Sequence, residues 1–109
     1  MNYKYGVYTS GQITELKKNI RKQIYFLLLI VDPKTREDYK NIDVNNAFAN
    51  TMVYFAGLND LLNNPPEIVR VMGLLEAALI EFNSNNFCYK NYRKLILDAG
   101  SEVLKIKEV

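Results

Sequence analysis

The 109-residue sequence predicts an all-α protein: a four-helix bundle, or a closely related helical bundle, preceded by a short N-terminal extended arm. Four long segments repeat apolar residues at spacings of three and four, which is the period of an amphipathic helix. Short polar stretches that contain Pro or Asn separate these segments. We therefore expect one helical domain over residues 1–109, with helices at about 11–31, 44–63, 65–82 and 87–107.

The arm and the first helix open the chain. The segment NYKYGVY carries three tyrosines and predicts an extended arm or one short strand, docked either on this chain or on another copy. Thr9 and Gln12 have the spacing of a capping box, so we expect the first helix to begin there. Asp32-Pro33 should end this helix, because a residue before proline avoids the α region.

The other three helices have similar boundary signals. Asp43 is a good N-cap for the second helix. In NNPPE we expect Asn64 to cap the third helix and Pro65 to take its first position, in a corner so tight that the second and third helices become antiparallel neighbours. The third helix carries a heptad-type seam formed by Ile68, Met72, Leu75, Leu79 and Phe82. The apolar line of the fourth helix is Tyr89, Tyr92, Ile96, Ala99, Val103 and Ile106.

The composition limits the possible classes of function. The net charge is only +2 and the pI is about 8.6, so attraction to nucleic acid would depend on local clusters. With one Cys and no His, an intramolecular disulfide is impossible and a metal site is not expected. The chain opens without the apolar core of a signal peptide, and no apolar run approaches the roughly 20 residues of a membrane span. We expect a cytoplasmic protein without membrane, cofactor or metal, and the Asn-, Lys-, Ile- and Tyr-rich composition hints at a bacterial or phage origin.

Single polar residues offer little catalytic chemistry. The absence of His removes the commonest general base. We expect Cys88, the only thiol, to be a small buried or half-buried residue. Arg70 and Glu76 fall on the most apolar helix, where we expect buried charges paired with neighbouring helices. Acid–base catalysis by Glu76 or a tyrosine is the alternative, but without a catalytic constellation we do not expect an enzyme.

Two clusters combine basic side chains with aromatic ones. KKNIRK places its basic residues within about 140° of the first helix, and YKNYRK interleaves basic residues with tyrosines at the start of the fourth. Such clusters can hold phosphates and stack bases. The candidate contacts are Lys18, Arg21, Lys22, Tyr89, Tyr92, Arg93 and Lys94. The alternative is a solvated cationic flank whose aliphatic stems cover the edge of the core.

The run IYFLLLIV at residues 24–31 is apolar on every side of the first helix. Half of it continues the core stripe, whereas Tyr25, Phe26 and Leu29 point the other way. A helix that is apolar all round must be covered on all sides. The cover could be the tyrosine arm, the 32–42 connection, whose composition suits it poorly, or a second copy of the chain. We therefore expect Tyr25, Phe26 and Leu29 at an oligomer interface.

Our leading hypothesis is a non-enzymatic helical binding protein, acting as an adaptor, accessory subunit or inhibitor of another macromolecule through its helix faces. It would form a homodimer or a higher homo-oligomer and bind a further, unidentified protein. The alternative hypothesis is a nucleic-acid or phosphorylated-nucleotide binding protein that uses the basic–aromatic clusters of the first and fourth helices.

Overall fold

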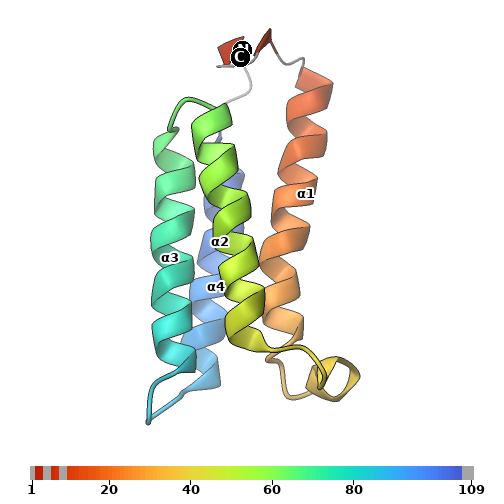
Figure 1. The fold of residues 1–109 in the computed structure, drawn as a ribbon, viewed down its shortest axis with the longest axis vertical. Helices are drawn as coiled ribbons and strands as arrows, with labels where there is room; N and C mark the ends of the chain where they lie inside the picture. The colour runs from red at the N-terminus through yellow and green to blue at the C-terminus, as the bar shows by residue number, and fades with distance from the viewer. Residues whose placement is uncertain (1, 4–5, 8–9, 107–109) are drawn as a thin grey trace.

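The computed structural model describes the backbone of residues 2–3, 6–7 and 10–106, and the side chains of residues 11–106. Four helices run alternately up and down a bundle that measures 43 × 23 × 20 Å (Figure 1). Their bounds are α1 (Ser10–Leu29), α2 (Val44–Leu61), α3 (Pro66–Phe82) and α4 (Tyr89–Val103). The prediction of an all-α four-helix bundle is confirmed.

The N-terminal arm has a more definite form than a single extended stretch. Strand β1 (Asn2–Tyr3) pairs antiparallel with strand β2 (Gly6–Val7), with Asn2 opposite Val7. Tyr5 and Tyr8 lie outside the described residues, as does Thr9, the expected cap of α1. The docking of the tyrosine side chains therefore stays a prediction.

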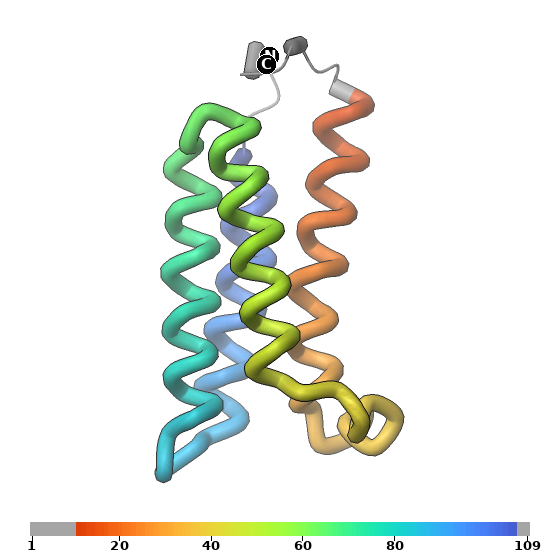
Figure 2. Tube along the Cα trace, viewed as in Figure 1, coloured from red at the N-terminus to blue at the C-terminus, as the bar shows by residue number. Residues whose placement is uncertain are grey.

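The four helices form a closed ring of neighbours. Helix α4 packs against α3 and α1, and α2 packs against α3 and α1. The α3–α4 contact is the most extensive of the four, and the α1–α2 contact is the least extensive. Figure 2 shows the same difference, because the α1 trace diverges from α2 toward the start of α1. The seam between α1 and α2 is therefore the most open one in the bundle.

The core lies along the inner stripes that the sequence spacing predicts. Each helix contributes residues three or four positions apart, since these share one face of a helix. The largest fully buried side chains include Ile24, Leu27, Phe48, Phe55, Ile68, Leu75, Tyr92 and Ile96. Burying each such apolar side chain stabilises the fold by about 1.5–3 kcal/mol relative to exposure.

The corner between α2 and α3 differs from the prediction by one residue. Asn63 (φ 61°) and Asn64 (φ 57°) adopt the left-handed conformation, which Asn tolerates better than most residues. The Asn64 amide donates to the Asn59 carbonyl (2.7 Å) and so closes the end of α2. Pro65 is the N-cap of α3, and the expected capping by Asn64 is wrong because this residue terminates the preceding helix.

The connection between α1 and α2 is well organised. Helix α1 ends at Leu29, two residues earlier than expected, and a short 3-10 helix, η1 (Arg36–Tyr39), follows. The Thr35 hydroxyl donates to the Leu29 carbonyl (2.6 Å), and the Arg36 guanidinium donates to the Ile30 carbonyl (3.1 Å). These bonds satisfy carbonyls that have no partner within the helix. At the other end, the Asp43 carboxylate accepts from the Asn46 amide (3.1 Å), which confirms the predicted cap of α2.

The helices were also compared with the length and apolar character of a membrane span. Within residues 10–106, no helix combines the length and the apolar character that crossing a bilayer requires.

Candidate functional site

Tyr25, the first of the three uncovered side chains of the 24–31 run, packs against α4. A methyl group added at Gly100 would lie 2.7 Å from Tyr25 Cζ, so the ring occupies the space that the glycine leaves open. Arg21 Nη2 donates to the Tyr25 hydroxyl (2.9 Å), and the guanidinium carbon lies 5.3 Å from the ring centroid. Tyr25 is therefore half-buried within this chain, and its place at an oligomer interface stays a prediction.

Phe26 is covered by the segment that the sequence made the least suitable candidate. Its ring meets Tyr39 of η1 edge to face, with centroids 5.7 Å apart and planes at 89°. Tyr39 is half-buried, and it is the one aromatic residue in an otherwise polar connection. Leu29 alone keeps substantial exposure, at 38%. The surplus apolar surface at this end of α1 is thus reduced to one leucine.

The two basic clusters do not merge into one surface. Arg21 lies beside Tyr25, whose hydroxyl sits over Gly100, near the end of α4. Arg93 lies seven residues earlier on α4, which is roughly 10 Å along the helix axis. Lys18 is exposed and pairs with Glu15 (3.5 Å). The antiparallel course of α1 and α4 therefore puts the clusters at different heights of the bundle.

The tyrosines of the second cluster are structural. Tyr92 is fully buried, and its hydroxyl donates to the Leu27 carbonyl near the end of α1. Burial raises the pKa of the Tyr92 phenol far above its ordinary value. Tyr89 is half-buried and stacks on Tyr92 with centroids 6.4 Å apart. The prediction that Tyr92 contacts a ligand is wrong, because its phenol completes a backbone hydrogen bond inside the core.

The hydroxyl of Tyr89 lies beside the Asp32 carboxylate without a hydrogen bond of normal geometry. Burial of the hydroxyl, followed by the effect of Asp32, raises the pKa of Tyr89 to about 12. The Lys34 amide donates to Asp32 Oδ1 (2.8 Å), and this bond together with Tyr89 lowers the pKa of Asp32. Tyr89 at the start of α4 and Asp32 in the turn after α1 thus lie side by side, and with these opposite pKa shifts neither is poised for proton transfer near neutral pH.

The buried charge of the bundle is Glu102, which the sequence interpretation missed. Its carboxylate accepts from Arg70 Nε of α3 and from Lys105 Nζ (3.1 Å). Arg70 thus pairs across helices as expected, but its side chain is 54% exposed. Glu76 is exposed, so its predicted burial is wrong. The only sequence signal for Glu102 was its position beside Val103 on the apolar line of α4.

The thiol of Cys88 also differs in burial from the prediction. Cys88 is exposed at the N-cap of α4, where its amide donates to Glu81 Oε1 (3.0 Å), and the prediction of a buried thiol is wrong. No group of three or more His, Cys, Asp or Glu side chains could hold a metal ion within the described part of the chain.

The most unusual surface is formed by the outward sides of α2 and α3, which we call the α2–α3 outer face. Val53, Val69 and Ile80 expose 73%, 53% and 73% of their surface. Small residues complete the face, and they recur at spacings of three and four on the side opposite the core. These small residues are Ala49, Ala56, Gly57 and Gly73.

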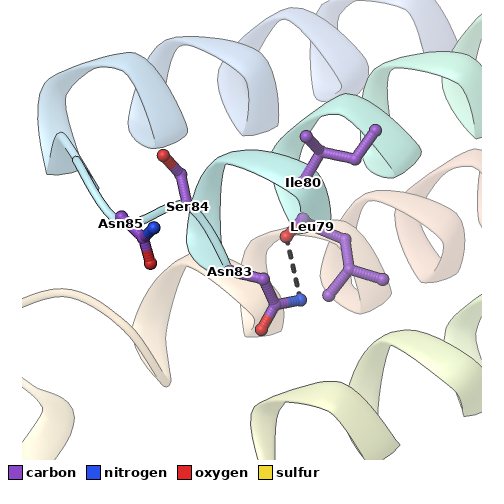
Figure 3. A pocket seen from close by; sticks show the side chains of 5 residues that line it. All are labelled: Leu79, Ile80, Asn83, Ser84 and Asn85. Carbon is purple, nitrogen blue, oxygen red and sulfur yellow. Dashed lines mark hydrogen bonds between the residues drawn. The ribbon is translucent and has the colours of Figure 1, made fainter.

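The end of α3 continues this face. A shallow depression there is lined by Leu79, Ile80, Asn83, Ser84 and Asn85 (Figure 3). The Asn83 side-chain amide donates to the Leu79 carbonyl (3.2 Å) and to Asn45 Oδ1 of α2 (2.9 Å). The amide therefore bridges α2 and α3, and the depression lies directly beside the exposed Ile80.

A second shallow groove follows the outer side of α4. Its lining includes Lys90, Arg93 and Lys94, together with Asn91, Leu97 and Asp98. Lys94 Nζ lies 3.7 Å from Asp98 Oδ2, so part of its charge is compensated. This groove is where basic side chains predicted from the sequence do lie together.

Comparison with known proteins gives no match, because no protein-family model, curated protein or solved structure is significantly similar to this chain.

Proposed function

We propose that this protein is a non-enzymatic binding protein that recognises another protein chain through the α2–α3 outer face. The observation that carries the proposal is the exposure of Val53, Val69 and Ile80 together on two neighbouring helices. Single exposed apolar residues are ordinary, but several on the outward sides of two neighbouring helices favour an interaction surface.

The charge distribution supports a protein partner for this face. Residues 44–59 of α2 contain no charged side chain, and Asp60 is the only one in the whole helix. Phosphate binding depends on Lys and Arg, and α2 has neither, so this face suits nucleic acid poorly. The core of a protein–protein interface, by contrast, is depleted of charged residues. Glu76 is the one charge within the α3 part of the face.

A second copy of the chain is the first partner to test. The outer sides of α1 and α4 carry the basic clusters, so two copies that met there would bring like charges together. The outer face of α2 lets two copies approach without this repulsion. A symmetric pair would place the same patch on both subunits, as two-fold interfaces do.

Light scattering after size exclusion tests self-association directly. We expect a dimer at tens of micromolar protein that becomes monomeric in Val53→Lys and in Ile80→Lys. Asn19→Lys, which adds the same charge at an exposed site of α1, is the matched control and should stay dimeric. The same variants should keep the helical circular dichroism of the parent protein.

A photo-cross-linking residue at position 53, in the native host, tests for a different partner. We expect one defined protein to be linked at position 53, not at position 19, and to be lost with Ile80→Lys. A monomeric parent protein with no such partner at position 53 would rule out the proposal.

A second candidate function follows from the α4 groove: binding of a phosphate-bearing ligand. Lys90, Arg93 and Lys94 line this groove with only Asp98 opposing them. Charge reversal at Arg93 and Lys94 should abolish a salt-sensitive shift of a fluorescent oligonucleotide, whereas reversal at Lys18 should leave it unchanged. Binding that ignores salt, or that ignores these substitutions, would eliminate this candidate.

A further inference from the structure

A cleft of about 450 Å³ lies between α1 and α2, and four of its nine lining residues are carboxamides. Gln23 comes from α1, Asn41 from the segment after η1, and Asn46 and Asn50 from α2. All four are exposed, and the structure gives none of their side-chain amides a partner within the described chain. The cleft has the size of a ligand pocket, for which 300–1,000 Å³ is typical.

The cleft lies near the end of α1, beside the start of α2 and the segment that joins the two helices. The Phe26 ring, Ala47 and Thr51 lie at its apolar base, and the Thr51 hydroxyl is already satisfied by the Ala47 carbonyl (2.8 Å). The edge-to-face contact with Tyr39 holds the Phe26 ring in place. The site therefore combines a fixed apolar base with a rim of unpaired amides.

We propose that this cleft binds an uncharged peptide segment in an extended conformation, with its main-chain amides paired to the carboxamides of the rim. A carboxamide carries a donor and an acceptor side by side, as a peptide group does, so the two can exchange reciprocal hydrogen bonds. The apolar base would accept one aliphatic side chain of the segment. The proposal does not rest on Val53, Val69 and Ile80, none of which lines the cleft.

The spacing of the amides matches an extended chain. Asn46 and Asn50 are four residues apart on α2, which is about 6.0 Å along the helix axis. Alternate peptide groups of an extended chain repeat at about 6.6 Å. A segment that lies along α2 would therefore present successive peptide groups of the same orientation to the two side chains.

The charges of the lining disfavour the main alternative ligands. No Lys or Arg lines the cleft, and its one charged residue is Asp43, which caps α2. A phosphate or a carboxylate would meet this negative charge without a compensating cation. A neutral amide ligand meets no such penalty.

An NMR titration with two matched peptides tests the proposal. The probe is the blocked peptide acetyl-Gly-Ala-Leu-Ala-Gly-amide, and the control is the same peptide with its central amides N-methylated. We expect saturable shifts of the side-chain amide signals of Gln23, Asn46 and Asn50 with the probe. Each main-chain hydrogen bond removed by N-methylation should weaken binding about fivefold.

Variants of the protein separate this site from the rest of the surface. Asn50→Leu keeps the shape but removes the amide, and should weaken the probe about fivefold. Asn91→Leu on α4 and Val69→Lys on α3, both exposed and outside the cleft, should leave the titration unchanged. Equal shifts with the N-methylated peptide, shifts elsewhere in the bundle, or no saturable shift would overturn the proposal. Uridine shifting the same amides more strongly than the peptide would also overturn it, in favour of a nucleobase site.

Discussion

Helix α1 has two neighbours, and it packs against them in opposite ways. Against α4 the contact is close: the Tyr25 ring packs on Gly100, and the Tyr92 hydroxyl donates a hydrogen bond to the Leu27 carbonyl. Against α2 the contact is the least extensive in the bundle, and the carboxamide cleft lies between the two helices near the end of α1. The α1–α4 seam therefore contributes stability, whereas the α1–α2 seam leaves polar groups free for a ligand.

The largest test of this difference is the removal of Tyr92. Tyr92→Ala deletes a fully buried ring whose hydroxyl bonds to α1, so we expect the free energy of unfolding to fall by about 3–5 kcal/mol in urea. Tyr92→Phe keeps the ring but leaves the Leu27 carbonyl unsatisfied, and should cost about 1–2 kcal/mol. A Phe variant as stable as the parent would show that water satisfies this carbonyl.

The two glycines Gly100 and Gly73 form a matched pair for the next test. A methyl group at Gly100 collides with Tyr25, so Gly100→Ala should destabilise the protein by about 1–2 kcal/mol despite its better helix propensity. Gly73→Ala meets nothing within 4 Å and should stabilise it by about 0.5–1 kcal/mol. Both effects are measured by urea unfolding followed by circular dichroism.

A double variant identifies the cause of the Gly100 effect. Tyr25→Ala combined with Gly100→Ala should cost less than the sum of the single changes, because the collision disappears. Strict additivity would mean that the two residues do not interact, and the contact described for the closed seam would be wrong.

Tyr39→Ala tests the edge of the open seam. Loss of the edge-to-face contact with Phe26 and of half-buried ring area should cost about 1 kcal/mol in urea unfolding. The helix content should remain the same, since η1 is short and lies outside the bundle. A loss as large as that of Tyr92→Ala would show that the two seams contribute equally, contrary to the difference described above.

The smallest expected effect concerns the pH dependence of stability. The hydrogen bond from Arg70, aided by Lys105, holds the pKa of Glu102 below its ordinary value of 4.5. The folded state therefore favours the ionised carboxylate, and this stabilisation is complete above pH 4.5 and is lost as the pH falls through the lowered folded-state pKa.

Glu102→Gln should accordingly cost about 1 kcal/mol at pH 7, because Arg70 is half-exposed, and close to nothing at pH 2–3. Urea unfolding at both pH values measures the difference. The control is Glu76→Gln, which removes an exposed carboxylate of α3 and should show no comparable change. An equal loss at both pH values would mean that packing, and not charge, accounts for the effect.

Local signals in the sequence were sufficient wherever one helix or one turn decides the outcome. Asp43 caps α2 as predicted, because an N-cap needs only the three residues that follow it. The role of Asn64 was predicted wrongly because this residue could either cap the start of α3 or terminate α2. The sequence could not decide between the two neighbours, and the left-handed conformation of Asn63 and Asn64 assigns both to the end of α2.

The candidate site depended on relations between helices, and there the sequence was a poorer guide. Arg21 and Arg93 belong to clusters that look alike in the sequence, but the offset of α1 against α4 separates them along the bundle. In the sequence Tyr92 is flanked by basic residues, as an exposed residue that stacks on bases would be. Only its burial in the folded chain shows that it is structural. The carboxamide cleft was not predicted, because its residues come from three segments that show no common pattern.

The sequence by itself determined the four helices, the antiparallel corner between α2 and α3, and the inner stripes, because helix periodicity and helix ends are local properties of a chain. Tertiary structure alone decided which side of α1 is sealed, where the buried carboxylate lies and which surface remains apolar. These outcomes depend on the angular offset and relative height of two helices, and no single helix encodes either quantity. Tyr25 illustrates the point, since its cover is a glycine 75 residues further along the chain.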